Sequence, residues 1–135
     1  MIELKQFTLL FVVSLMSASF SIVQLLPSHY NCNNVKSSRS PIIREDCRDS
    51  LNLFSSSNIT LTFKNGYTQS CGTCRVTILK SKTLVPPSTA PKSWAVTALH
   101  QGYDHCNGNP VTATIGDGEK IDVLLAYGNG STCAQ

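Results

Sequence analysis

Two cysteines in the motif Cys71-Gly72-Thr73-Cys74 have the spacing that most directly suggests chemistry. In a reducing compartment, a Cys-x-x-Cys motif ahead of a helix indicates a redox pair or half of a zinc site. Here the flanking residues predict a strand, so no helix N-terminus activates either thiol. The sequence has no second Cys-x-x-Cys and no suitably spaced pair of histidines. We therefore predict structural disulfides, with no metal and no cofactor.

The number of cysteines supports this interpretation, because six is even and high for a chain of 135 residues. Residues three apart on a strand point to opposite faces, so Cys71 and Cys74 are expected to bond different partners. The order of the elements along the chain instead suggests Cys32–Cys133, which would tie the two ends, and Cys47–Cys106, which would join the two helices or their ends. Cys71 would then be left to pair with Cys74. Cys71 and Cys74 could pair with each other only if Gly72 forms a bulge or turn, and six cysteines allow 15 pairings. The cysteines concerned are Cys32, Cys47, Cys71, Cys74, Cys106 and Cys133.

Two histidines and a carboxylate, His100, His105 and Asp104, are the candidates for acid–base catalysis. They give the alternative function, a small secreted hydrolase similar to a ribonuclease. His100 and Asp104 are four apart and share a helical face, but ordinary solvated residues explain that spacing equally well. No recognised catalytic motif accompanies them. We therefore predict no catalytic residues and a protein that is not an enzyme.

Basic residues gather in the first part of the chain. From residue 22 to residue 92 there are nine Lys or Arg against three Asp or Glu, and from 93 to 135 one against four. Such a patch favours acidic surfaces, for example membranes, cell-wall polymers or nucleic acid. Almost no aromatic residue lies among these bases, so specific nucleic-acid binding is not expected. The candidate binding patch comprises Lys36, Arg39, Arg44 and Arg48.

The N-terminus has the pattern of a secretory signal peptide over residues 1–21. Lys5 precedes an apolar stretch, and small residues follow it. Cleavage is expected before Ile22, and cleavage after Ser19 is almost as suitable. The alternative is an uncleaved anchor. No other stretch is long or apolar enough to cross a membrane. A secreted, extracellular protein is expected, with glycosylation at the sequons of Asn58 and Asn129.

The remaining pattern predicts the elements that position these residues. Residues 22–40 form a tethered segment with a short strand near 30–35, and 41–54 form a helix whose apolar positions are spaced 4, 4 and 3 apart. Alternation over 59–64 leads through Asn65-Gly66 into a return strand over 67–79, which predicts a hairpin. Residues 84–91 are a loop, and 91–103 a second helix. A second hairpin joins 111–115 to 121–127. The apolar helix positions are Ile43, Cys47, Leu51 and Phe54, then Trp94, Ala95, Ala98, Leu99, Gly102 and Tyr103.

Two helix-then-hairpin units predict an α+β fold, a disulfide-stapled two-layer α/β sandwich. Both helices would cover one face of a four-stranded antiparallel sheet, leaving threonines on the other face. Residues 41–135 would form this single domain, which we expect to be a monomer. With 41% hydrophobic and 14% charged residues, the composition excludes a disordered tail and a polybasic arm.

The order of these features resembles small cysteine-rich secreted fungal proteins that share the fold of smut-fungus killer toxins, many of them candidate effectors. The resemblance rests on Glu45-Asp46-Cys47 in the first helix, Ser70-Cys71-Gly72-Thr73-Cys74-Arg75-Val76, and a helix closing on Cys106. It implies a toxin-like or effector role, in which the protein binds an unknown host or competitor target outside the producing cell. The sequence has no adjacent Lys/Arg pair for dibasic cutting, which favours a single uncut chain. A structural wall-associated protein is the remaining possibility.

Overall fold

The computed structural model describes Pro27 and residues 29–33, 39–80 and 87–133. The expected signal peptide, residues 1–21, and Lys36 lie outside these ranges, as does most of the 22–40 segment. The described part contains two helices and eight strands. None of its helices is long and apolar enough to span a membrane.

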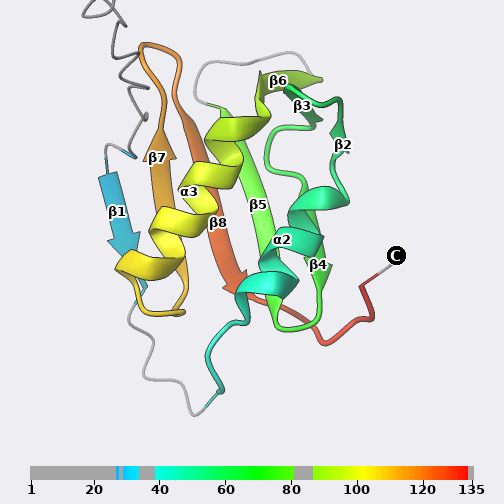
Figure 1. The fold of residues 1–135 in the computed structure, drawn as a ribbon, viewed down its shortest axis with the longest axis vertical. Coiled ribbons are helices and arrows are strands. Elements are labelled where there is room, and N and C mark those ends of the chain that lie inside the picture. The colour runs from blue at the N-terminus through cyan, green and yellow to red at the C-terminus, as the bar shows by residue number, and fades with distance from the viewer. Residues whose placement is uncertain (1–26, 28, 34–38, 81–86, 134–135) are drawn as a thin grey trace, which may run out of the picture.

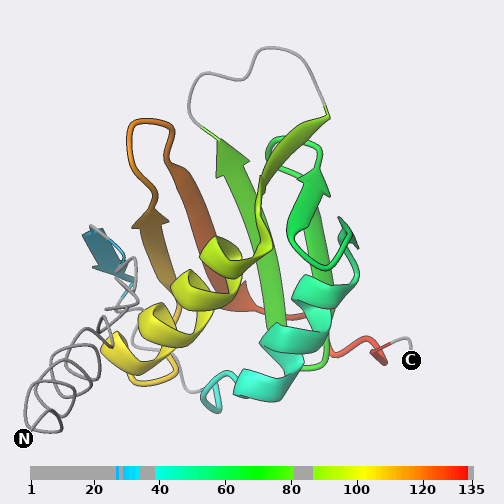
Figure 2. The same ribbon diagram turned by 45° about the horizontal axis from the view of Figure 1, so that its top comes forward.

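The main sheet is antiparallel and five-stranded, in the order β1-β7-β8-β5-β4. Both helices lie on one face of it, α2 against β4 and β5 and α3 against β7 and β8 (Figures 1 and 2). The two-layer arrangement is therefore as predicted, but the sheet has five strands instead of four. The elements are β1 (His29–Cys32), α2 (Arg44–Asn52), β4 (Thr68–Cys71), β5 (Cys74–Lys80), α3 (Lys92–His105), β7 (Val111–Ile115) and β8 (Ile121–Tyr127).

A second, three-stranded sheet replaces the first predicted hairpin. It has the order β2-β3-β6, formed by Ser55–Ser56, Thr60–Phe63 and Ser88–Pro91. Asn65-Gly66 does form a turn, with Tyr67 N–H donating to the Lys64 carbonyl at 2.8 Å. That turn carries the chain from the small sheet to the large one. β3 instead pairs with β6, where the loop over 84–91 was expected, because Leu61 and Ala90 are buried partners.

The predicted return strand is divided into β4 and β5 by a tight turn at Gly72-Thr73. Gly72 has φ +54°, which a residue without a side chain adopts at little cost. Cys71 and Cys74 are consequently cross-strand partners. They lie on the same face of the sheet, whereas a continuous strand would place them on opposite faces.

The core lies between the main sheet and the helices. Alternate residues of the three central strands are buried there, and the helices contribute Leu51, Ala95, Ala98 and Leu99. Ile43 was expected on this buried stripe but is 48% exposed. It is the N-cap residue of α2 and has extended backbone (φ −90°, ψ 128°), so the helical period does not reach it. The alternation over 59–64 would place Ile59 on the buried face with Leu61 and Phe63, but Ile59 is 78% exposed because it precedes β3.

Three disulfides join elements that the fold brings together: Cys32–Cys106, Cys47–Cys74 and Cys71–Cys133. Cys71 and Cys74 do have different partners, as expected, but the predicted pairs Cys32–Cys133 and Cys47–Cys106 are wrong. β1 lies beside β7 and near the end of α3, which brings Cys32 to Cys106. The packing of α2 on β5 brings Cys47 to Cys74, and no described cysteine is free.

Candidate functional site

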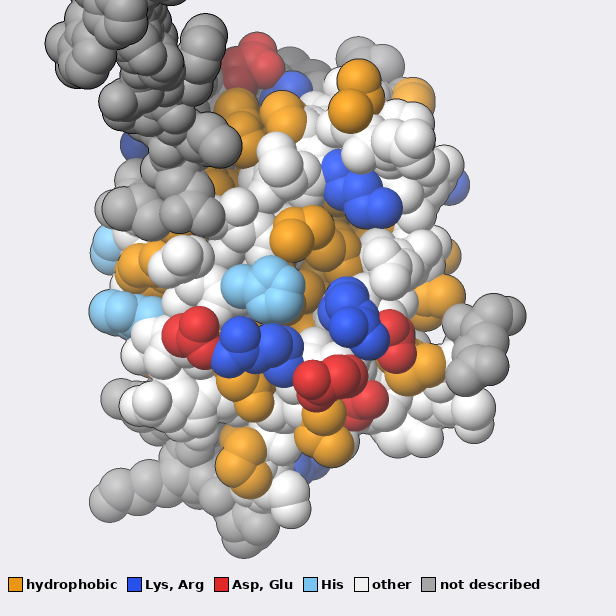
Figure 3. Space-filling view, in the orientation of Figure 1, with side chains coloured by type: hydrophobic (Ala, Val, Ile, Leu, Met, Phe, Trp, Pro, Cys, Tyr) orange, Lys and Arg blue, Asp and Glu red, His pale blue; other side chains and the backbone are white. Residues whose placement is uncertain are grey.

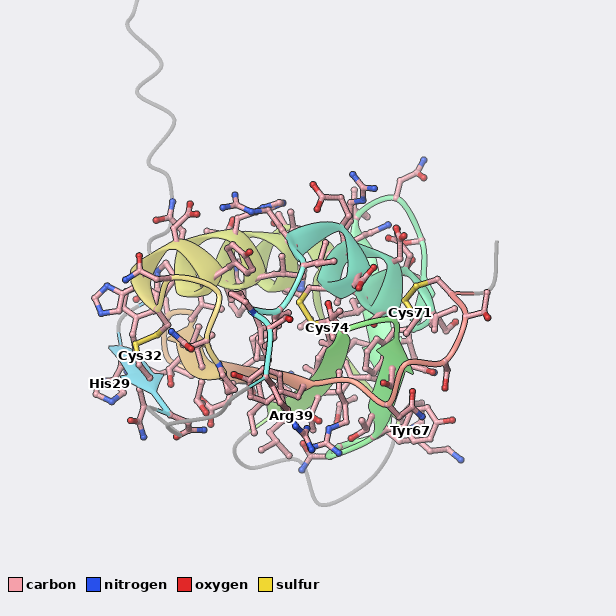
Figure 4. All side chains as sticks on the ribbon, turned by 90° about the horizontal axis from the view of Figure 1, so that it is seen from below. His29, Cys32, Arg39, Tyr67, Cys71 and Cys74 are labelled. Carbon is pink, nitrogen blue, oxygen red and sulfur yellow. A yellow bond between two sulfur atoms is a disulfide. The ribbon has the colours of Figure 1, made fainter. Side chains whose placement is uncertain are left out.

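An open hollow of about 650 Å³ lies at the end of the sheet where β8 leaves it. Ser70, Arg75 and Ala126 enter it from the sheet face opposite the helices, since they alternate with buried residues of the same strands. Arg39 lies on that same side, away from both helices (Figure 4). The described residues that line it are Asn33, Arg39, Ser70, Arg75, Pro110, Ala126, Tyr127, Gly128 and Asn129.

The C-terminal segment forms one wall of the hollow because it is fixed across the β4–β5 turn. Gly128 N–H donates to the Thr73 carbonyl at 2.8 Å, and Gly130 N–H to the Gly72 carbonyl at 3.0 Å. Gly72 N–H in turn donates to the Ser131 carbonyl at 2.7 Å. The Cys71–Cys133 disulfide then closes this contact covalently. The wall is thus held by both hydrogen bonds and a cross-link.

Gly128 is required for this close approach. A Cβ at this position would lie 2.5 Å from the Gly72 carbonyl oxygen and 2.7 Å from the Cys74 nitrogen. Both contacts are with backbone, which cannot move aside without breaking the turn. Any larger residue would therefore push the C-terminal segment away from the hollow.

Helix α2 holds the same turn from the other side of the sheet. Asp46 Oδ2 accepts hydrogen bonds from both Thr73 N–H and Thr73 Oγ1, each at 2.7 Å, and Thr73 Oγ1 accepts from Ile43 N–H at 2.8 Å. The buried Ser50 Oγ accepts from Cys71 N–H at 2.9 Å. Helix, turn and C-terminal segment therefore form one connected unit beneath the hollow.

The electrostatic character of the hollow is positive. Its described lining includes two arginines and no acidic residue. The Arg39 guanidinium lies 5.5 Å from the centroid of the Tyr127 ring, a distance suited to cation–π attraction. Arg75 is exposed on β5. Two guanidinium groups beside neutral amides and a hydroxyl can bind an anionic group that also carries hydrogen-bonding partners.

The predicted basic patch is separated by the fold. Arg44 and Arg48 project from α2 on the helix layer, whereas Arg39 lines the hollow on the other side of the sheet. Arg44 pairs with Asp104, and Arg48 Nε lies 3.5 Å from Asp49 Oδ1. Figure 3 shows basic and acidic side chains interspersed on the helix face.

Arg75 joins Arg39 in place of the helix arginines, although it was not among the residues predicted to bind. A signal was present, because Arg75 is the polar residue between Cys74 and Val76 in an alternating strand. Alternation places it on the face away from the core. Alternation does not place Arg39 on a face of the sheet, because Arg39 lies outside the strands.

The candidate acid–base residues have different neighbours. The His105 ring stacks on Tyr30 with centroids 4.3 Å apart, and Asp104 pairs with Arg44. His100 and His105 are five residues apart on α3, which places them about 140° apart around the helix axis. The structure therefore does not place the two imidazoles on one helical face.

Both predicted glycosylation sites are exposed. Asn58 lies between β2 and β3, and Asn129 lies on the rim of the hollow. Asn129 Oδ1 accepts hydrogen bonds from Ser131 N–H at 3.0 Å and from Ser70 Oγ at 3.3 Å. A glycan at Asn129 would thus stand beside the hollow.

Comparison of the chain with protein-family models, with curated proteins and with solved structures finds no match.

Proposed function

We propose that this protein is a secreted, cysteine-rich effector or toxin-like protein that acts outside the producing cell by binding. The observation that carries the proposal is the hollow at the end of β8. It combines two arginines with neutral polar groups, and its described lining has no carboxylate. Such a surface favours association with an anionic partner over proton transfer.

The disulfides support a role outside the cell. Disulfides persist in oxidising compartments and are rare in reducing ones. The Cys71–Cys133 bond fixes the wall of the hollow itself, so the proposed binding surface depends on oxidation. The effector or toxin-like part of the proposal comes from the resemblance to killer-toxin-like fungal proteins, which rests on cysteine placement and element order.

Retention on cell surfaces tests the proposal. Residues 22–135 would be secreted, oxidised, labelled, and incubated with intact cells and with isolated walls of candidate hosts and competitors. Two double variants compare the faces: Arg39→Gln with Arg75→Gln in the hollow, and Arg44→Gln with Arg48→Gln on the helix layer. Each removes the same charge. We expect retention by the wild-type protein and the helix-layer variant, with loss in the hollow variant and at high salt.

Three results would contradict the proposal. Absence of retention on every cell and wall preparation would remove the binding function. Loss in the helix-layer variant alone would move the binding surface to α2. Turnover of RNA that is lost in His100→Ala or His105→Ala would favour the hydrolase instead.

A further inference from the structure

We propose that the hollow binds an acidic glycan, with the carboxylate of a uronic acid residue held between Arg39 and Arg75. This inference rests on the proposed function and specifies the ligand of the same site. The two arginines supply the charge, and the neutral side chains around them supply partners for hydroxyl groups.

The arginines determine that the bound group is an oxyanion. A guanidinium is planar and directs its donors in a fork that matches a carboxylate. The Arg39 guanidinium carbon lies 5.5 Å from the centroid of the Tyr127 ring, and Arg75 is exposed on β5. The described lining residues include no carboxylate that would repel an incoming one.

The rest of the lining favours a sugar as the carrier of that carboxylate. Asn33, Ser70 and Asn129 offer amide and hydroxyl groups, which both donate and accept hydrogen bonds as sugar hydroxyls do. The partly exposed Ala126 adds a small apolar surface beside these polar groups. A volume of about 650 Å³ is within the range of small-molecule sites, and the hollow is open, so a polymer can continue beyond it.

Nucleic acid and lipid fit this lining less well. Binding of single-stranded nucleic acid relies on aromatic faces that stack the bases. Tyr127 is the one aromatic residue in the described lining, and Arg39 lies over its ring. A lipid surface requires exposed apolar anchors beside the charge. Of the two aliphatic residues in the described lining, Pro110 is buried, and Ala126 is small and only partly exposed.

Calorimetric titration with defined oligosaccharides tests the inference. The probes are a tetrasaccharide of α-1,4-linked galacturonic acid, the same tetrasaccharide with its carboxyl groups reduced to alcohols, and a single-stranded RNA of equal charge. We expect binding of the uronate and at least tenfold weaker binding of the reduced sugar and of the RNA. Arg75→Gln should weaken uronate binding about tenfold, and Arg75→Lys less, because it keeps the charge and loses the fork.

Arg48→Gln is the matched control, since it removes the same charge from an exposed site on the opposite layer. Equal binding of the reduced sugar, equal binding of RNA, or an equal loss in Arg48→Gln would overturn the inference. Failure to bind uronate by a protein that is still retained on cells or walls would overturn this inference alone. Failure of both assays would overturn the proposed function as well. Near-ultraviolet circular dichroism of each variant verifies the fold.

Discussion

Replacing Gly72 by alanine tests how the β4–β5 turn is held against α2. The substitution has two separate costs. Gly72 has φ +54°, and placing alanine in this left-handed region costs about 1–2 kcal/mol. In addition, the new Cβ would lie 2.3 to 2.8 Å from the Asp46 carboxylate group. The carboxylate would have to move, which breaks its two hydrogen bonds to Thr73.

The second cost can be estimated from those bonds. Hydrogen bonds to a charged group contribute about 1.5–3 kcal/mol each when buried, and we take about 2 kcal/mol for this partly buried pair together. Gly72→Ala should then lower the free energy of unfolding by about 3–4 kcal/mol. Asp46→Ala should lower it by about 2 kcal/mol, because it removes the same bonds. The double variant should be no less stable than Gly72→Ala alone, since the bonds can be lost only once.

Gly118→Ala separates the backbone cost from the steric one. Gly118 also has positive φ, +68°, but a Cβ there would meet nothing within 4 Å. We expect a loss of about 1–2 kcal/mol, the backbone cost alone. Guanidinium unfolding of the oxidised proteins, followed by Trp94 fluorescence, gives all four values. Additive losses in the double variant, or equal losses for Gly72→Ala and Gly118→Ala, would refute the proposed role of Asp46.

Three further predictions concern other parts of the molecule. Ser50→Ala should lower the free energy of unfolding by about 1–3 kcal/mol, because the buried backbone N–H of Cys71 loses its acceptor. The control Ser55→Ala, at an exposed position, should have little effect. Equal chemical-unfolding midpoints for the two variants would contradict this prediction. Burial raises the pKa of Tyr30 above its ordinary value near 10, so the unfolded chain loses this proton first and stability should fall as pH rises above about 10. Tyr30→Phe should therefore flatten the alkaline decline in the unfolding midpoint, and an unchanged decline would disprove the link. Finally, protein from a glycosylating host should bind uronate more weakly than its Ser131→Ala variant, which lacks the sequon of Asn129; equal affinities, with glycosylation verified by mass, would show that this glycan leaves the hollow open.

Local patterns in the sequence predicted much of the secondary structure. The helix expected over 41–54 is present as α2 at Arg44–Asn52, and the helix expected over 91–103 as α3 at Lys92–His105. The last hairpin is present as β7 and β8. The two strands alternate between buried and partly exposed residues, α2 has an amphipathic period and α3 has a narrow buried stripe. Such patterns depend only on neighbours within a few residues. The prediction of the first hairpin was wrong, because Asn-Gly specifies a turn but does not specify which strands pair beyond it.

The candidate site was predicted only in part. Arg39 and Asn129 were singled out from the sequence, and both line the hollow. Lys36 lies outside the described residues, and the structure places Arg44 and Arg48 on the other layer. The prediction of a single basic patch was based on four positive charges that lie within 13 residues of the sequence. The chain passes from one side of the sheet to the other between Arg39 and α2, so nearness in sequence did not become nearness in space.

The sequence by itself determined that this protein would be an α+β structure held by disulfides, because periodicity and an even cysteine count are local or compositional properties. Only the tertiary structure decided that Cys47 bonds Cys74, that Cys71 bonds Cys133, and that Arg39 and Arg75 share a hollow. These pairings join residues separated by 27 to 62 positions. Contacts at such separations depend on which surfaces pack together, and the packing energy is shared among many side chains rather than encoded in any one segment.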